Sequence, residues 1–356
     1  MEAAGNGVMA SSAGVSGIAR LVRDVVSSPS VASIFQPLTR DRGVIMRLHR
    51  LRDRQRGTPG RDPEMLREVL AYLRRERYEL LSLVELLRRL GGDGPPLRRA
   101  VAFTIDDGYQ DQAEIGAPLF AEFDCPVTTF VTTGFIDGRI WFWWDKISYV
   151  FQQTASTSIE VALDGREVRY HWSGRGERDR ACEELAASCK RVADAEKHAA
   201  IVRLAEAAEV DIPAHPPDRY APMSWSQLRA CEGMGMTFGP HTVTHPILSQ
   251  TSAEASRGEI VDSWARLKAE AHSPVPVFAY PNGLPGDFGE REIDVLRGEG
   301  FLGAVMAVSG YNSAADFRAR DEARFKLRRF GRASELAYVV RCAAGLERLV
   351  PAMWRG

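Results

Sequence analysis

Three short apolar segments, each followed by a polar or turn motif, recur along this chain and restrict the folds open to it. Their lengths and β-branched content are typical of buried strands, and helical patterns such as 224–234 lie between them. Strands that alternate with helices form parallel sheets, in which the carboxyl ends of the strands build the active site. The sequence therefore predicts an α/β barrel with a site at the ends of segments 100–105, 235–240 and 275–280.

The first two motifs contain residue types that bind metals. Asp106 and Asp107 follow the first segment, and His241 and His245 follow the second. Three protein ligands and an open position are typical of a catalytic zinc site, so Asp107 and the two histidines are the predicted ligands. Asp106 is then placed to take a proton from the attacking water. A spacing of four also occurs for two solvated loop histidines, so the hypothesis depends on both motifs together.

These motifs resemble those of a known family, the NodB-type polysaccharide deacetylases of carbohydrate esterase family four, which remove N- or O-acetyl groups from sugars. The family motif TFDDG stands at 104–108, with Ile105 in place of the usual phenylalanine. The motif H-[ST]-x-x-H stands at 241–245. The resemblance covers most of 43–330, and it is carried by the joint occurrence and the order of the two motifs.

The resemblance implies a fold, a cofactor and a set of roles. The fold is a distorted, incomplete (β/α) barrel. The cofactor is one divalent metal held by Asp107, His241 and His245. Two imidazoles and one carboxylate favour zinc, although the same set accepts cobalt, nickel, manganese or iron. Asp106 is the implied general base, and the implied substrate is an N-acetylated sugar.

The third family motif, usually RPPYG, corresponds to 279–283, where alanine replaces the arginine that orients the base in the family. The arginines that could substitute for it are Arg291, Arg328 and Arg329, and the sequence does not choose among them. A rigid turn here still offers a backbone N–H for an oxyanion hole. The residues that we expect to line this part of the site are Tyr280, Pro281 and Asn282.

The general acid of the family is usually a histidine after the third motif, but no histidine follows His272 in this chain. In relatives that look circularly permuted, notably the poly-N-acetylglucosamine deacetylases, this histidine lies near the N-terminus. Segment 43–50 resembles that element, because it is a short apolar strand pattern that reaches His49. His49 is therefore the predicted acid for the leaving nitrogen. The alternative is a strand-end histidine that only packs or forms a hydrogen bond.

The barrel pattern is interrupted between the first and second motifs by a stretch without family motifs. Asp164 and Gly165 predict a β-hairpin turn, and 177–209 predicts two charged amphipathic helices. We interpret this stretch as an inserted cap, which in a metal hydrolase usually selects the substrate. The predicted division is 1–40 as an N-terminal extension, 41–145 as the first barrel part, 146–218 as the cap, 219–335 as the second barrel part and 336–356 as a C-terminal helix.

Aromatic residues at 141–144 precede the cap. Trp144 could stack on a sugar ring, but large aromatic side chains are mostly buried, so we favour a hydrophobic plug between cap and barrel. Tyr109 follows the Asp-Asp-Gly turn and is predicted either to contact substrate or to pack in the wall of the site. Asp145 precedes an apolar helical run in the manner of a helix N-cap.

The overall charge of the chain gives no sign of a nucleic-acid partner. The formal net charge is -1, with 45% hydrophobic and 26% charged residues, which suits one large globular α/β domain with additions. The charge is nevertheless uneven, because 40–99 contains sixteen arginines and nine acids. We interpret most of these arginines as solvated helix faces. The alternative is a basic rim that attracts an anionic substrate, such as a nucleotide-linked or lipid-phosphate-linked sugar.

Five cysteines without a C-x-x-C pair are typical of reduced thiols. Charged residues interrupt 1–33 before a signal-peptide core can form, and no window reaches the roughly 18 apolar residues of a membrane span. We therefore expect a cytoplasmic protein without stable membrane insertion, with a short amphipathic helix at 15–26. No heptad pattern indicates an oligomeric state.

The sequence thus predicts a metal-dependent enzyme that removes the N-acetyl group from an N-acetylated amino sugar in a glycan, glycoside or activated sugar. One alternative is an amidase or deformylase for a small N-acyl metabolite, which the lack of an export signal favours. The other is a non-catalytic carbohydrate-binding relative. The missing arginine of the third motif favours it, whereas Asp106 and the complete ligand set oppose it.

Overall fold

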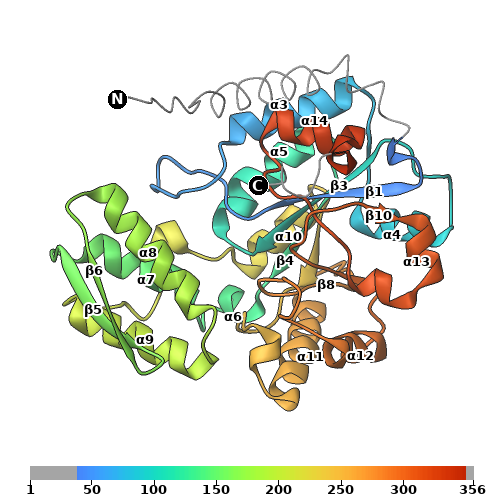
Figure 1. Ribbon diagram of the computed structural model, residues 1–356. Coiled ribbons are helices and arrows are strands. Elements are labelled where there is room, and N and C mark those ends of the chain that lie inside the picture. Colours follow the sequence, from blue (N-terminus) through green and yellow to red (C-terminus); the bar gives the residue numbers. More distant parts are fainter. Residues whose placement is uncertain (1–37, 350–356) are drawn as a thin grey trace, which may run out of the picture.

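The computed structural model describes residues 38–349, which form a curved parallel sheet, helices around it and a separate group of elements at one side (Figure 1). The strands are β1 (Arg42–Leu48), β2 (Glu79–Leu80), β3 (Ala100–Asp107), β4 (Val127–Val131), β5 (Ser158–Leu163), β6 (Arg166–His171), β7 (Met236–Pro240), β8 (Val277–Ala279), β9 (Gly303–Val305) and β10 (Asn312–Ser313). The α-helices are α3 (Pro63–Arg75), α4 (Leu83–Gly91), α5 (Ala117–Glu122), α6 (Thr133–Ile136), α7 (Trp143–Gln153), α8 (Arg175–Cys189), α9 (Asp194–Ala207), α10 (Trp225–Glu232), α11 (Ala253–Glu270), α12 (Glu290–Gly298), α13 (Ala314–Ala319) and α14 (Leu336–Ala344). Short π- or 3-10 segments are η2 (Gln112–Gly116), η3 (Asp218–Tyr220), η4 (Leu248–Gln250), η5 (Asp321–Phe325) and η6 (Leu346–Arg348).

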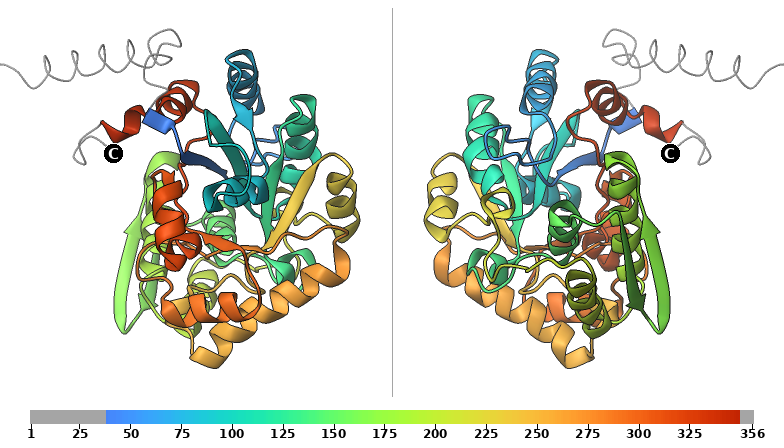
Figure 2. Two further views of the ribbon diagram at one scale, coloured as in Figure 1. Left: turned by 90° about the vertical axis from the view of Figure 1, so that its right-hand side faces the viewer. Right: turned by 90° about the vertical axis from the view of Figure 1, so that its left-hand side faces the viewer.

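The central sheet has the strand order β10-β1-β3-β4-β7, and β2 pairs with the start of β3. β1, β3, β4 and β7 are parallel neighbours in continuous register. Only β10 runs antiparallel, against the start of β1. The carboxyl ends of the parallel strands therefore lie at one edge, and helices surround the outside of the sheet (Figure 2).

The remaining side of the barrel is closed by single bridges and one short strand pair. β8 pairs with β9, and the bridges are Phe238 with Pro274, Val305 with Leu327, and Phe330 with Met46. Proline has no N–H to donate, so Pro274 and Pro276 keep this side from forming a continuous ladder. The result is the distorted, incomplete (β/α) barrel that the family resemblance implied.

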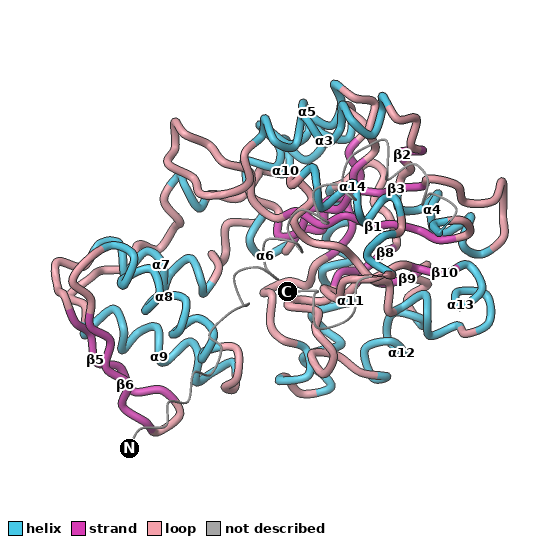
Figure 3. Tube along the Cα trace, turned by 45° about the horizontal axis from the view of Figure 1, so that its top comes forward, coloured by secondary structure: helices cyan, strands magenta, loops and turns pink. Residues whose placement is uncertain are grey.

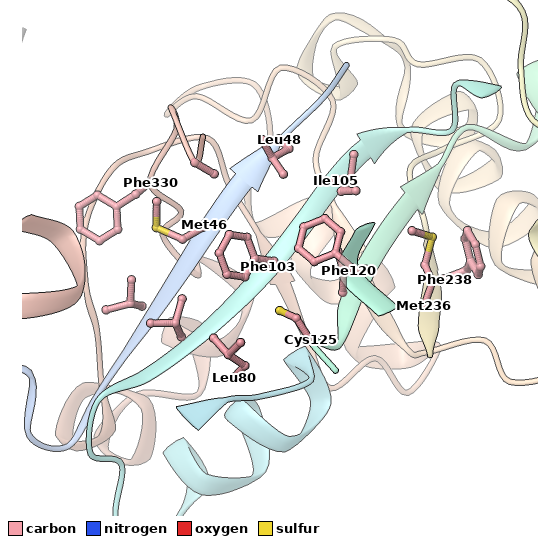
Figure 4. Close-up of a cluster of buried hydrophobic side chains, with 14 of the residues drawn as sticks. Met46, Leu48, Leu80, Phe103, Ile105, Phe120, Cys125, Met236, Phe238 and Phe330 are labelled. Carbon is pink, nitrogen blue, oxygen red and sulfur yellow. The ribbon is translucent and has the colours of Figure 1, made fainter. Parts of the chain in front are cut away.

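Alternation along β1 and β3 sorts side chains between the two faces of the sheet. Met46, Phe103 and Ile105 point outward and pack with Phe120 of α5 and with Phe330 (Figure 4). The alternate positions face the barrel interior. Toward the carboxyl ends these inward residues are Ile45 and Arg47 of β1, followed by His49 just after the strand, and Ala102, Thr104 and Asp106 of β3. The interior therefore changes from apolar to polar toward the edge where the motifs meet.

The segment from α7 to α9 forms a group with a hydrophobic core of its own (Figures 1 and 3). The expected hairpin is present, since β5 and β6 pair antiparallel around Asp164 and Gly165. The two expected helices are α8 and α9. Trp144 packs against this core and also against the aromatic cluster that contains Tyr109, so it joins the group to the barrel.

Three local expectations need correction. Asp145 is not a helix N-cap, because α7 begins earlier, with Phe142 at its N-cap, and Asp145 lies within its first turn. The helix expected at 224–234 is shorter, because Ser224 serves as the N-cap of α10. The single helix expected at 336–356 is interrupted, because Gly345 at φ 87° ends α14 before η6.

Some expectations fall outside the described residues, namely the amphipathic helix at 15–26, most of the extension 1–40 and the last part of 336–356. All five cysteines lie in the described part and are free. Among the described residues, no helix has both the length and the apolar character needed to cross a membrane.

Candidate active site

Two successive carboxylates reach the site because the backbone turns at the end of β3. Successive side chains of a strand point to opposite faces, so Asp106 and Asp107 would diverge in a regular strand. Instead, Asp107 has φ 91° and Gly108 has φ 95°. Such left-handed values are rare for a non-glycine residue and usually mark a functional constraint. The turn keeps both carboxylates buried at the same end of the barrel.

The structure brings the three predicted metal ligands together. One ligand atom from each of Asp107, His241 and His245 lies within 4.8 Å of the others. Asp107 Oδ1 is 3.7 Å from Nε2 of each histidine, and the two Nε2 atoms are 3.1 Å apart. His245 also has a left-handed φ of 62°. Loop backbone rather than a helix therefore makes the two rings converge.

The electrostatics of this group suit a cation. Burial raises the pKa of Asp107 well above its ordinary value, and the charge of Asp106 raises it further. Burial also lowers the pKa of His241 and of His245, so both rings are held neutral. A bound cation would offset the cost of ionising Asp107, and neutral imidazoles are the form that binds metal.

Neighbouring groups fix the orientation of both histidines. Nδ1–H of His241 donates to the carbonyl of Ala279 at 2.7 Å, which leaves Nε2 as the free ligand atom. The ring of His245 makes T-shaped contacts with the rings of Phe142 and Trp144, whose centroids lie 5.5 and 4.8 Å from its own. Its backbone N–H donates to Oγ1 of Thr242 at 3.0 Å.

Trp144 is itself held by a buried hydrogen-bond chain. Its Nε1 donates to the hydroxyl of Tyr109 at 3.0 Å, and that hydroxyl donates to Oδ2 of Asp145 at 2.6 Å. The guanidinium of Arg50 lies 3.7 Å from the centroid of the Tyr109 ring. Tyr109 is only 1% exposed, so the structure places it in the wall of the site, where it connects the first motif to α7.

Of the three arginines that the sequence left open, Arg329 is the one that contacts Asp106. Its Nη1 and Nη2 donate to Oδ1 and Oδ2 of Asp106 at 2.6 and 2.8 Å, and both side chains are almost fully buried. Burial alone would raise the pKa of Asp106, but the charge of Arg329 lowers it below its ordinary value. Arg291 instead binds Glu292 and the carbonyls of the Leu248 to Thr251 segment.

His49 lies on the open side of Asp106. Its Nε2 is 3.8 Å from Oδ2 of Asp106, and 46% of its side chain is exposed. Desolvation, with the charges of Arg47 and Arg329, lowers the pKa of His49 to about 3, while Asp106 acts in the opposite direction. Because nearly half of the ring is exposed, solvent moderates this shift, but its direction favours a neutral imidazole.

The third-motif turn follows Ala279, whose carbonyl accepts the hydrogen bond from His241. Asn282 has φ 59°, and its side chain donates to Asp287 at 2.7 Å. Among the described residues, the backbone N–H of Asn282 has no backbone acceptor. Tyr280 is buried and stacks on Phe288, with centroids 3.6 Å apart. The free N–H of a rigid, left-handed turn is the kind of donor that an oxyanion hole uses.

The family model for polysaccharide deacetylase matches residues 93–288, more than half of the chain. The chain belongs to the polysaccharide deacetylase family. Two solved structures have a similar fold. Streptococcus pyogenes deacetylase PplD, in complex with acetate, is 17% identical with a TM-score of 0.53, covering 84% of this chain and 98% of that chain. IcaB from Ammonifex degensii is 16% identical with a TM-score of 0.54, covering 85% and 97%. A comparison with curated protein sequences finds no match.

As a polysaccharide deacetylase, the chain is a hydrolase that acts on sugars. The matched region contains both carboxylates and both histidines of the site, whereas His49 and Arg329 lie outside it. Sequence reasoning left Arg329 as one of three candidates and did not single out Arg47. One signal could have chosen Arg329 over Arg328: in an extended segment Arg329 shares a face with Leu327, which packs in the barrel interior.

Proposed function

We propose that this deacetylase is a metal-dependent enzyme that removes the N-acetyl group from an N-acetylated amino sugar. The observation that carries the proposal is the position of Asp106. It is held by Arg329 and lies beside the group of Asp107, His241 and His245. A base fixed next to a three-ligand group is the arrangement that hydrolysis of an amide by activated water requires.

Asp107, His241 and His245 would hold the ion, and the donor set of two nitrogens and one oxygen favours zinc. A divalent ion bound there would polarise the acetyl carbonyl and lower the pKa of a water molecule. Asp106 would accept the proton of that water as it attacks. Arg329 keeps Asp106 ionised and aims its oxygens, so the base needs no reorganisation during the reaction.

The leaving nitrogen needs a proton, because an amine anion is a very poor leaving group. We assign its delivery to His49. The resting imidazole is neutral, so it must first receive the proton that Asp106 has taken from water. Oδ2 of Asp106 and Nε2 of His49 are 3.8 Å apart, which a small ring movement reduces to hydrogen-bond distance. The N–H of Asn282 would stabilise the oxyanion that forms on the acetyl group.

The test combines metal analysis with acetate release. The purified protein would be offered N-acetylglucosamine oligomers, UDP-N-acetylglucosamine and neutral N-acetylated glycosides, as wild type and as Asp106→Asn. Asp164→Asn in the exposed hairpin turn is the matched control, because it makes the same chemical change far from the site. We expect one metal per chain and acetate release that only Asp106→Asn abolishes. A metal-free protein with full activity would contradict the proposal.

A further inference from the structure

A cavity of about 460 Å³ opens beside the proposed proton donor. This volume is within the range of roughly 300–1,000 Å³ that small-molecule sites occupy. Its charged lining consists of Arg47, Arg50, Arg61 and Arg332, and His49 also belongs to its wall. Of the described residues that line it, none is acidic. His49 belongs both to this wall and to the surroundings of Asp106, so the arginine-lined cavity reaches the place where the amide would be cleaved.

The cavity has more positive charge than its neighbours compensate. Arg50 is neutralised by Asp111 at 2.8 Å. Arg61 and Arg332 have the same partner, because Glu335 lies 3.2 Å from the first and 3.9 Å from the second. One carboxylate therefore serves two guanidinium groups, and within residues 38–349 one positive charge at this rim has no counter-charge.

Arg47 adds a second uncompensated charge. Its Nε is buried and has no hydrogen-bond partner among the described residues. The carboxylates closest to it electrostatically are Asp106 and Asp107, but Arg329 already binds the first, and the second belongs to the metal-ligand group. Arg47 therefore adds positive charge to the cavity wall that no carboxylate of its own offsets, and an anion bound in the cavity would offset it.

The number and direction of these groups select the anion. Arg47 lies on the cavity wall formed by β1, whereas Arg61 and Arg332 come from two separate loops. Guanidinium groups that approach from several sides suit a tetrahedral anion with three or more oxygens better than a planar carboxylate. We propose that the cavity binds a phosphate group of the substrate, so that the sugar to be deacetylated is a phosphate ester or phosphodiester of an N-acetylamino sugar. This inference rests on the proposed function.

The first test is a preference measured between matched sugars. Acetate release would be compared for methyl N-acetylglucosaminide, N-acetylglucosamine 1-phosphate and UDP-N-acetylglucosamine. We expect kcat/KM to be about 10- to 100-fold higher for a phosphorylated sugar, the effect of one or two charge-assisted hydrogen bonds. A higher kcat/KM for the monoester than for the diphosphate assigns the cavity to sugar phosphates. A higher kcat/KM for the diphosphate assigns it to activated or lipid-linked sugars. A gain of the same size with the carboxylate sugar N-acetylmuramic acid would overturn the assignment to phosphate.

Two variants connect the preference to the cavity. Arg47→Gln removes the buried charge, and Arg332→Gln removes one that is 43% exposed and so endangers folding less. Both should lower the ratio of kcat/KM for phosphorylated and neutral sugars about tenfold or more. The control is Arg75→Gln, since Arg75 is 65% exposed on α3, forms its ion pair with Glu76 and does not line the cavity. It should leave the ratio unchanged. An unchanged ratio in both cavity variants would overturn the inference.

A binding measurement separates this inference from the proposed function. Inorganic phosphate would be titrated calorimetrically into wild type, Arg47→Gln and His241→Ala. We expect binding in wild type and in His241→Ala, where the metal-ligand group is broken, and about tenfold weaker binding in Arg47→Gln. If no sugar releases acetate, the proposed function fails, and this titration alone then decides whether the cavity binds phosphate. The inference would be overturned if phosphate did not bind to wild type. It would also be overturned if binding were weakened in His241→Ala but not in Arg47→Gln. Equal rates on neutral and phosphorylated sugars would overturn it and leave the proposed function intact.

Discussion

The two sides of the catalytic centre are built in different ways. The proposed metal-ligand side consists of Asp107, His241 and His245, which come from two compact motifs and are oriented by backbone groups and aromatic rings. The side assigned to proton transfer joins Asp106 to His49 and Arg329, which lie 57 positions before it and 223 after it in the chain. The first side depends on local turns, whereas the second depends on the barrel bringing distant strands together. Variants on the two sides should therefore fail in different ways.

The largest effect is expected on the metal-ligand side. His241→Ala removes one of three ligands, so the protein should lose both bound metal and acetate release, while its fold persists. Elemental analysis and circular dichroism of the purified variant would measure this. If the variant kept one metal per chain, the ligand assignment would be wrong.

Arg329→Met tests the side assigned to proton transfer. It leaves Asp106 buried without its partner, and breaking such a pair costs about 3–5 kcal/mol. We expect a corresponding fall in the free energy of unfolding, measured with urea, and a lower kcat with metal still bound. The pKa of Asp106 should rise once the charge of Arg329 is gone. As the pH falls, the variant should therefore lose activity at a higher pH than wild type does. Arg328→Met, on the opposite face of the same segment, is the control.

His49→Ala should lower turnover by about 10²- to 10⁴-fold, the usual contribution of a positioned proton donor. Metal content and stability should stay near wild type, because the ring is nearly half exposed and His49 is not one of the three proposed ligands. Normal turnover in this variant would remove His49 from the scheme and weaken the contrast between the two sides.

The smallest effect is expected at Tyr109→Phe. The change removes the hydroxyl that connects Trp144 to Asp145 without altering the shape of the wall. Because Trp144 contacts the His245 ring, we expect metal affinity to fall about tenfold, at the low end for groups that orient a ligand. Competition with a metal chelator would measure this. An unchanged affinity together with a lower kcat would assign Tyr109 to the other side of the site.

The sequence predicted the parts of this molecule that depend on nearby residues. The Asp-Asp-Gly turn, the histidine pair and the Asp164 hairpin each lie within a few residues, so their motifs can be recognised in the sequence, although the left-handed φ values of Asp107 and His245 cannot. The partner of Asp106 could not be chosen in this way. Arg328 and Arg329 differ only in the face that they present, and the face is set by the bridges at Leu327 and Phe330.

Asp145 shows the same limit at smaller scale. Its position before an apolar run is typical of a cap, but tertiary contacts place it within the first turn of α7, opposite Tyr109. Burial raises the pKa of Asp145 to about 7, although the hydrogen bond from Tyr109 acts against this shift. Neither the contact nor the burial is visible in the sequence around residue 145, because Tyr109 and Arg50 come from other segments.

The uneven closure of the barrel has a consequence for motion. β1, β3, β4 and β7 form continuous ladders, whereas the bridges at Pro274, Leu327 and Phe330 are single. Amide protons in the ladders should exchange with solvent only when the whole domain unfolds, and those near the single bridges should exchange through local opening. The Asn282 turn and Arg329 both lie in this softer half. Hydrogen exchange should therefore be faster at the third-motif turn than at the carboxyl ends of β3 and β7, although both regions line the same site.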